Sequence, residues 1–182
     1  EFCFPMIGLH PTSVNKNYKK ELDIVAGQLA SSNGYVAIGE IGLDLYWDKT
    51  FLREQLLAFE KQVEWALEYH LPIVIHTREA FDYIYKVLQP YKETGLTGIF
   101  HSFTGTSEEA AKLLDFPGFM IGINGVVTFK KSQLPEVLKD VPLARIVLET
   151  DSPYLTPVPF RGKRNESSYI PLIAQKIAEI TG

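Results

Sequence analysis

Four short apolar segments of the sequence are each followed directly by side chains that can bind metal ions. These are Glu40 after Val36–Gly39, His76 after Ile73–Ile75, His101 after Ile99–Phe100, and Glu149 and Asp151 after Ile146–Leu148. If the segments are parallel strands, their carboxyl ends lie at one edge of the sheet, and these side chains meet there. Mixed imidazole and carboxylate donors suit zinc, manganese or iron, and magnesium where oxygens dominate. The pattern predicts a divalent metal centre, which would make a bound water acidic enough to supply hydroxide near neutral pH.

Each of these side chains also has a structural interpretation when it is taken alone. A single histidine at the end of a strand, such as His76, most often makes a structural hydrogen bond. Glu40 and Asp44 could cap a helix or stabilise a turn, and Asp151 precedes Ser-Pro and could shape a turn. The joint occurrence of two histidines and two carboxylates at the ends of separate apolar segments favours the metal interpretation.

A second group of polar residues could bind an anionic substrate beside the metal. His10 follows an apolar segment in GLHP, where a turn role and a substrate role are equally supported. Arg78 lies two residues after His76. Arg161 and Arg164 belong to the basic segment RGKRNE, where guanidinium groups could pair with phosphate oxygens; the alternative is an exposed loop.

Three aromatic residues lie close in sequence to the candidate site: Tyr46, Trp47 and Tyr154. Their rings could stack on a nucleobase. Packing in the core or at the rim of the site is the slightly favoured alternative.

Hydrophobic patterning predicts six strands that alternate with helices. The strands are short and nearly uniformly apolar, as is typical of a parallel sheet covered on both faces, and are expected at Phe4–Leu9, Tyr35–Ile41, Pro72–Ile75, Thr97–Phe100, Phe119–Ile123 and Arg145–Leu148. Helices are expected at Asn17–Ser31, Thr50–Tyr69, Arg78–Tyr91, Ser107–Leu114, Ser132–Leu138 and Ser167–Ile180. The helix over 50–69 has the clearest apolar stripe, with Asp48 or Thr50 as its expected N-cap.

This alternation predicts an α/β fold with parallel strands, for which two architectures compete. An open doubly wound sheet would normally carry a glycine-rich turn after its first strand, and neither GxGxxG nor GxxxxGK[ST] occurs. A (β/α)₈ TIM barrel needs eight strands and typically about 250 residues. The 182 residues have room for about six strand–helix units, so a barrel would be incomplete.

The composition excludes several protein classes. Hydrophobic residues make up 46% of the chain and charged residues 22%, which excludes a disordered chain and a fibre. No apolar run approaches the ~18 residues of a membrane span. The single cysteine, Cys3, cannot form an intrachain disulfide, and the N-terminal segment lacks the features of a signal peptide, so a cytoplasmic protein is expected. The net charge of −4 disfavours a protein that coats nucleic acid by bulk electrostatics.

The sequence resembles the TatD family of metal-dependent deoxyribonucleases. The matching segments, in family order, are IGLHP at 7–11, GEIGLD at 39–44, LPIVIHTREA at 71–80, FHSFTG at 100–105, GVVTFK at 125–130, ETDSPYLTP at 149–157 and RGKRNESSYI at 161–170. The resemblance implies a (β/α)₈ TIM barrel related to the amidohydrolases. It also implies one or two divalent metal ions (Mg, Mn or Zn) and hydrolysis of DNA phosphodiester bonds, often from a 3′ end.

The resemblance also implies roles for individual residues. Glu40 corresponds to a carboxylate that contacts or bridges the metals, and His76 and His101 correspond to histidine ligands. Asp151 corresponds to an aspartate that binds metal and can take a proton from the attacking water. Arg78 and the RGKRNE segment are similar to parts of the substrate rim.

The chain departs from the family pattern at its start and its end. The family opens with an HxH motif that supplies two metal ligands, and no HxH occurs here. Residues 1–182 are therefore expected to form a single catalytic domain, a TatD-like barrel without its first two strand–helix units and last helical segment. The expected function is 3′–5′ exonucleolytic hydrolysis of DNA, without a membrane or an obligate protein partner. The alternatives are a metal-dependent ester or amide hydrolase, and an inactive fragment or binding module that lacks the HxH ligands.

Overall fold

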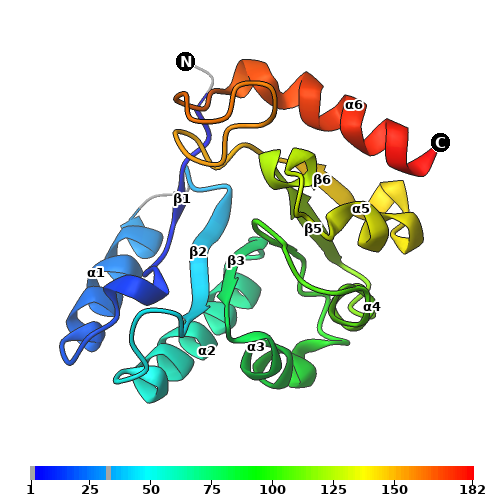
Figure 1. Ribbon diagram of the computed structural model, residues 1–182. Helices are drawn as coiled ribbons and strands as arrows, with labels where there is room; N and C mark the ends of the chain where they lie inside the picture. Colours follow the sequence, from blue (N-terminus) through cyan, green and yellow to red (C-terminus); the bar gives the residue numbers. More distant parts are fainter. Residues whose placement is uncertain (1–2, 32–33) are drawn as a thin grey trace. The chain divides into compact units, whose positions relative to one another are not determined.

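The structure is a computed structural model that describes residues 3–31 and 34–182. The chain, coloured along its sequence in Figure 1, divides into two compact units, Glu1–Ile99 and Phe100–Gly182. Among the described residues, no helix has both the length and the apolar character needed to cross a membrane.

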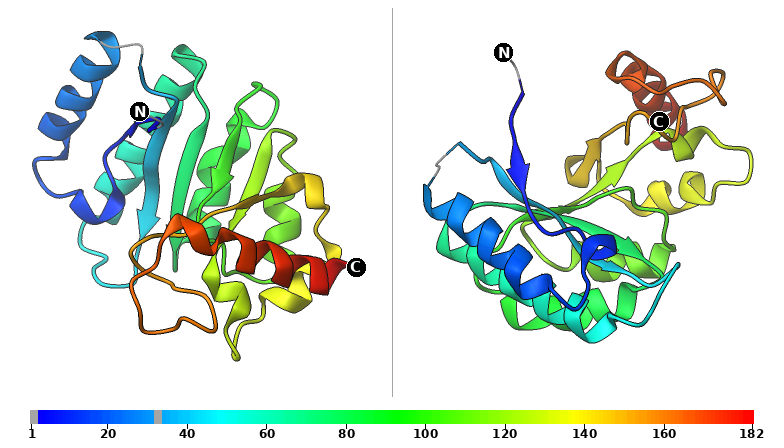
Figure 2. Two further views of the ribbon diagram at one scale, coloured as in Figure 1. Left: turned by 90° about the horizontal axis from the view of Figure 1, so that it is seen from above. Right: turned by 90° about the vertical axis from the view of Figure 1, so that its left-hand side faces the viewer.

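The first unit is a parallel sheet covered by helices. Its elements in chain order are β1 (Met6–Ile7), α1 (Tyr18–Ser31), β2 (Ala37–Asp44), α2 (Leu52–Glu68), β3 (Ile73–Arg78) and α3 (Phe81–Leu88). β2 is the central strand of these three and pairs in parallel with β1 and with β3. Figure 2 shows the helices of this unit along one face of the sheet. β4 (Gly98–Phe100) lies at the boundary between the units.

The second unit repeats the strand–helix succession with shorter elements. They are α4 (Ser107–Leu114), β5 (Phe119–Ile123), α5 (Leu134–Val137), β6 (Ile146–Leu148) and α6 (Ile170–Thr181). β5 and β6 pair in parallel, with Ile121 opposite Ile146. The guanidinium of Arg145 donates hydrogen bonds to the carbonyls of Leu114, Phe116 and Phe119, which ties the end of α4 to the start of β5.

Apolar side chains from strands and helices form the core of each unit. In the first unit, the fully buried Ile41 and Ile75 come from paired strands, and the fully buried Phe59 and Val63 come from α2, which packs on β2. Side chains of this size each stabilise a fold by about 1.5–3 kcal/mol when buried. The apolar stripe predicted for residues 50–69 is therefore confirmed as the face of α2 that packs on the sheet.

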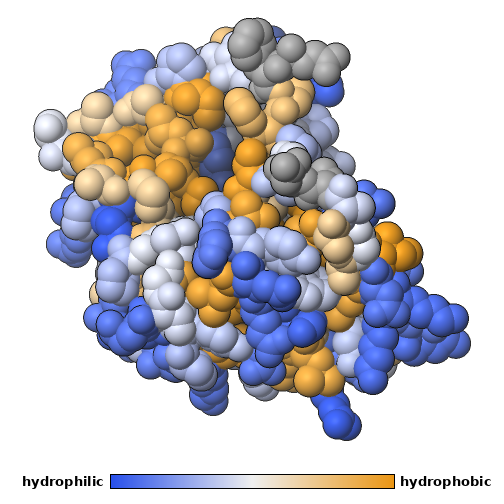
Figure 3. Space-filling view, turned by 180° about the vertical axis from the view of Figure 1, so that it is seen from behind, coloured by the Kyte–Doolittle hydropathy of each residue, from blue (hydrophilic) through white to orange (hydrophobic). Residues whose placement is uncertain are grey.

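An apolar surface remains exposed on the second unit. Hydrophobic side chains gather there where α6 passes β6 (Figure 3, upper left). They line a cavity of about 300 Å³ that includes Leu143, Ile146, Leu148 and Ile177.

The structure confirms the parallel α/β class and the six strands, and corrects some boundaries. β2 and β3 extend to Asp44 and Arg78, so that Glu40 and His76 lie inside strands and do not follow them. The N-cap residue of α2 is Phe51, and no side chain caps it. Asp48 instead accepts a hydrogen bond from the Thr50 N–H at 2.8 Å. Hydrogen bonds from Thr50 also lower the pKa of the Asp48 carboxyl.

Candidate metal centre

An irregularity in the pairing of β2 with β3 determines which face of the sheet Glu40 occupies. Ile38 pairs with Ile73 and Ile41 pairs with Ile75. Between these two pairs β2 therefore advances by three residues, whereas β3 advances by two. Such an extra residue is a bulge, and it keeps both isoleucines of β2 on the buried face although they are three positions apart. The opposite face receives Glu40.

His76 lies on the same face as Glu40, between two carboxylates. It pairs with Gly42, which is flanked on its face by Glu40 and Asp44. A Cβ atom at Gly42 would lie 2.1 Å from the His76 carbonyl oxygen, and φ is +133°, so this position requires glycine. The Nε2 atom of His76 lies 2.9 Å from Asp44 Oδ2, and Nδ1 lies 3.9 Å from Glu40 Oε2.

These distances assign the proton on the neutral His76 ring. The buried Asp44 carboxylate only accepts hydrogen bonds when it is ionised, so Nε2 of His76 is the donor. The lone pair then lies on Nδ1, which faces Glu40. This is the arrangement in which an outer carboxylate orients a histidine ligand for a metal.

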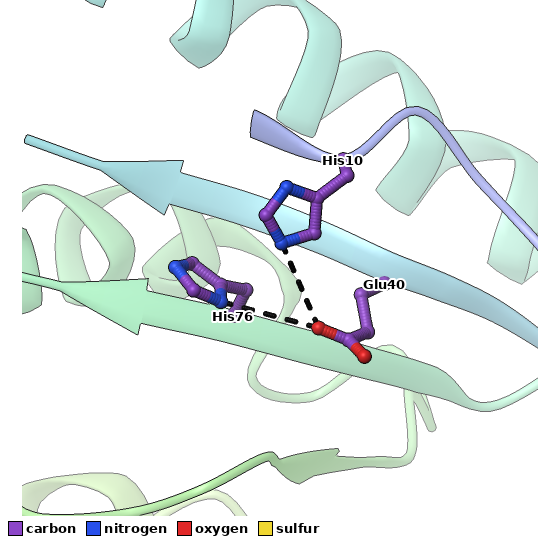
Figure 4. A group of neighbouring side chains, drawn as sticks. All are labelled: His10, Glu40 and His76. Carbon is purple, nitrogen blue, oxygen red and sulfur yellow. Dashed lines mark ion pairs between the residues drawn. The ribbon is translucent and has the colours of Figure 1, made fainter. Parts of the chain in front are cut away.

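His10 completes a group of three side chains that could hold a metal ion. The ligand atoms of His10, Glu40 and His76 lie within 4.8 Å of one another (Figure 4). Nε2 of His10 lies 3.7 Å from Glu40 Oε2. Nδ1 accepts a hydrogen bond from the Thr12 N–H at 3.2 Å, which places the proton of the neutral ring on Nε2. In this tautomer His10 presents an N–H toward Glu40, whereas His76 presents a lone pair.

Two buried glutamines of α2 hold the main chain of this site. Gln55 bonds to both main-chain polar groups of Asp44, and Gln62 does the same for Leu9, the neighbour of His10. Neither residue was among those predicted from the sequence. Their signal was present, because residues 55 and 62 are polar and lie seven apart, on the side of the helix that carries the apolar stripe.

The second unit contains a similar arrangement of one histidine and two carboxylates. His101 follows β4, and its Nδ1 lies 2.7 Å from Glu149 Oε2. Nε2 faces Asp151 Oδ1 at 3.5 Å. The other oxygen of Glu149 accepts a hydrogen bond from the Ser102 N–H at 2.5 Å. A Cβ atom at Gly122 would lie 2.6 Å from the Glu149 carboxylate, so the glycine leaves room for it. The pattern assigns the proton of the neutral His101 ring to Nδ1 and the lone pair to Nε2.

Both arrangements fit a divalent metal by the chemistry of their donors. Each offers one imidazole lone pair next to a carboxylate that is partly exposed: Glu40 for His76, and Asp151 for His101. Nitrogen and oxygen donors of this kind suit zinc, manganese and, with further oxygens, magnesium. The four residues predicted from the sequence thus fall into two pairs, Glu40 with His76 and His101 with Asp151. That all four residues bind metal at one common centre stays a prediction.

The predicted substrate-binding arginines lie on aromatic rings or in the loop after β6. The guanidinium of Arg78 lies 3.7 Å from the centroid of the Tyr46 ring, and that of Arg161 lies 3.7 Å from the Phe129 ring. Arg164 is exposed. The next residue, Asn165, is buried and donates hydrogen bonds to the carbonyls of Thr150 and Tyr154. The RGKRNE segment is therefore fixed to the loop that carries Asp151.

Several known proteins are similar to this chain in sequence. It is 40% identical over 181 residues to the uncharacterized metal-dependent hydrolase YabD of Bacillus subtilis (strain 168), covering 99% of this chain and 70% of that protein. It is 39% identical over 176 residues to the uncharacterized metal-dependent hydrolase YcfH of Escherichia coli (strain K12), covering 96% and 65%. It is 34% identical over 188 residues to the 3′-5′ ssDNA/RNA exonuclease TatD of Pantoea ananatis (strain LMG 20103), covering 100% and 72%. The chain thus spans 65–72% of the length of these relatives.

The fold comparison agrees with these relatives. The crystal structure of YjjV, a TatD homolog from Escherichia coli, matches with a TM-score of 0.85 and 28% identity, covering 97% of this chain and 68% of that one. This match confirms the expected fold class, a TatD-type TIM barrel of which the chain contains six strands. The model of the family described as TatD related DNase matches residues 1–182. The chain therefore belongs to the TatD family of metal-dependent hydrolases.

Proposed function

We propose that this chain contributes to metal-dependent hydrolysis of DNA phosphodiester bonds, with single strands or 3′ ends as substrate. One observation carries the proposal: in each unit, one carboxylate holds an imidazole so that its lone pair faces a second, more exposed carboxylate. The relative named as a 3′-5′ ssDNA/RNA exonuclease supports the choice of substrate. On this proposal, residues 1–182 act as a single catalytic domain.

Four residues would hold one or two divalent ions (Mg, Mn or Zn): Glu40, His76, His101 and Asp151. A bound ion supplies Lewis acidity for the phosphate and acidifies a water. Asp151, which is partly exposed, accepts a proton from the water that attacks phosphorus.

Other groups of this chain would bind the substrate. The Nε2–H of His10, on the atom that lies 3.7 Å from Glu40 Oε2, would donate a hydrogen bond to a phosphate oxygen. The guanidinium groups of Arg78, Arg161 and Arg164 pair with phosphate oxygens. A net charge of −4 is consistent with an enzyme that grips a few phosphates locally and does not coat a duplex.

The test is cleavage of a 5′-labelled single-stranded oligonucleotide in magnesium or manganese. We expect Glu40→Gln and Asp151→Asn to lower the rate by about a thousandfold or more, since removal of one key electrostatic group costs 10²–10³ and each residue serves more than one role. Matched controls are Glu64→Gln in the first unit and Glu136→Gln in the second, both exposed and paired with a lysine. Unchanged rates in both site variants would contradict the proposal.

A second candidate is hydrolysis of carboxylic esters or amides at the same groups. Two relatives are named only as metal-dependent hydrolases, and the same donors can promote attack on a carbonyl carbon. A panel of ester and amide substrates, run beside the oligonucleotide, separates the two. Turnover of an ester that Asp151→Asn abolishes, without cleavage of any oligonucleotide, would favour the second candidate.

A further inference from the structure

Two large aromatic side chains are exposed beside the candidate metal centre. Tyr46 and Trp47 follow β2 directly, and they are 48% and 76% exposed. Their rings meet edge to face, with centroids 4.7 Å apart. Tryptophan is normally well buried, so an exposed pair of this kind next to a polar site indicates a binding surface.

Arg78 lies over both rings. Its guanidinium carbon is 3.7 Å from the centroid of the Tyr46 ring and 5.6 Å from that of Trp47, within the range of cation–π attraction. Arg78 is the last residue of β3 and lies opposite Asp44 of β2 in the strand register. We call the surface formed by Tyr46, Trp47 and Arg78 the aromatic platform.

Hydrogen bonds fix the aromatic platform to the residues of the centre. The Tyr46 N–H donates to Asp44 Oδ1 at 3.1 Å, and the other oxygen of that carboxylate bonds to His76. The Leu45 N–H donates to the Arg78 carbonyl at 2.9 Å. The carboxylate that orients His76 therefore also holds the start of the platform.

We propose that the aromatic platform stacks a nucleobase of a single-stranded substrate. The inference rests on the proposed function, because it requires a nucleic acid at the centre. Aromatic rings and a guanidinium plane bind any base by its flat face, whatever the sequence. Binding at this platform therefore requires that a base is present but does not depend on which of the four bases it is.

The test is a binding cycle between Trp47 and the base. The wild-type chain and Trp47→Ala are titrated with fluorescent single-stranded oligonucleotides, one normal and one with abasic residues at its 3′ end. We expect wild type to bind the abasic strand about tenfold more weakly than the normal one, from the size of base–aromatic stacking. Trp47→Ala should weaken binding of the normal strand by the same factor and leave binding of the abasic strand unchanged.

Two further measurements make the result specific. Trp47→Phe keeps a ring and should retain most of the affinity for the normal strand, whereas Tyr83→Ala, an exposed aromatic of α3, should behave as wild type. The chain has two tryptophans and Trp65 is buried, so a normal strand should quench the exposed Trp47 more than the abasic strand does.

The outcomes separate the inference from the function. If Trp47→Ala binds and cleaves both strands as wild type does, the aromatic platform is not a base site, while the nuclease proposal stands. If wild type neither binds nor cleaves any oligonucleotide, the nuclease proposal fails, and the platform inference is overturned with it.

Discussion

Gln55 holds Asp44 by both of its main-chain polar groups. The side-chain oxygen of Gln55 accepts a hydrogen bond from the Asp44 N–H at 3.0 Å, and its nitrogen donates to the Asp44 carbonyl at 3.2 Å. Two turns along α2, Gln62 makes the same pair of bonds to Leu9, at 2.6 and 3.3 Å. One face of α2 therefore sets the main-chain positions of two segments, those that carry Asp44 and His10.

Replacing Gln62 by leucine should destabilise the first unit. The change leaves the N–H and carbonyl of Leu9 without these partners, which costs about 1–3 kcal/mol for each buried group. We expect the free energy of unfolding, measured with urea, to fall by about 2 kcal/mol or more. Gln28→Leu, an exposed position of α1, should stay within about 0.5 kcal/mol of wild type. An equal stability of the two variants would show that the bonds from Gln62 contribute little.

Replacing Gly42 by alanine should destabilise the chain through the backbone. The new Cβ would lie 2.1 Å from the His76 carbonyl oxygen, and the φ of +133° is strained for any other residue. We expect a loss of about 3 kcal/mol or more in a urea titration. Gly27→Ala in α1 is the control, since its Cβ meets nothing within 4 Å and alanine favours a helix by roughly 0.5–1 kcal/mol. A Gly42→Ala variant as stable as wild type would contradict the pairing of Gly42 with His76.

Replacing Glu149 by glutamine should weaken metal binding through His101. The one oxygen of a glutamine amide can satisfy the Ser102 N–H, and its NH₂ group then faces Nδ1 of His101. The proton of the neutral ring moves to Nε2, and the lone pair turns away from Asp151. We expect manganese affinity, measured by calorimetry, to fall about 10–100-fold.

The control for this change is Glu136→Gln, an exposed glutamate of α5, which should bind manganese as wild type does. Nitrogen-15 chemical shifts report the histidine tautomer independently of metal. A Glu149→Gln protein with an unchanged His101 tautomer and unchanged affinity would rule out this positioning role.

Divalent metal should raise the thermal stability of the chain. A ligand that binds only the folded state stabilises it by about 2.7 kcal/mol at a hundred times its Kd. For a chain of this size, that corresponds to a rise in Tm of roughly 5–10 °C. We expect manganese to raise Tm by this amount, EDTA to reverse it, and Glu40→Gln to lose most of it. The same Tm in manganese and in EDTA would contradict a metal centre and favour a binding module without metal.

The order of the strands and helices and most of the candidate metal ligands could be predicted from the sequence. Short apolar segments predicted the strands because a parallel sheet covered by helices leaves little room for polar residues. The placement of Glu40 and His76 inside their strands was not predictable, because it depends on which residue of β2 faces which residue of β3. Pairing across strands is a tertiary property that the pattern of one segment does not contain. The same limit applies to the partner of Gln55, which is main chain on another element, although the position of Gln55 on the apolar side of α2 was visible in the sequence.

The bulge between Ile38 and Ile41 has a consequence for how this protein can change over time. The two residues between these isoleucines are one more than a regular strand needs to keep both on the same face. Loss of one residue there would restore regular alternation, so that both isoleucines would still face the core opposite Ile73 and Ile75, with only one residue left between them. A deletion at the bulge is therefore expected to spare the pairing of the core isoleucines and to displace or remove Glu40, so that the site could be lost while the fold persists.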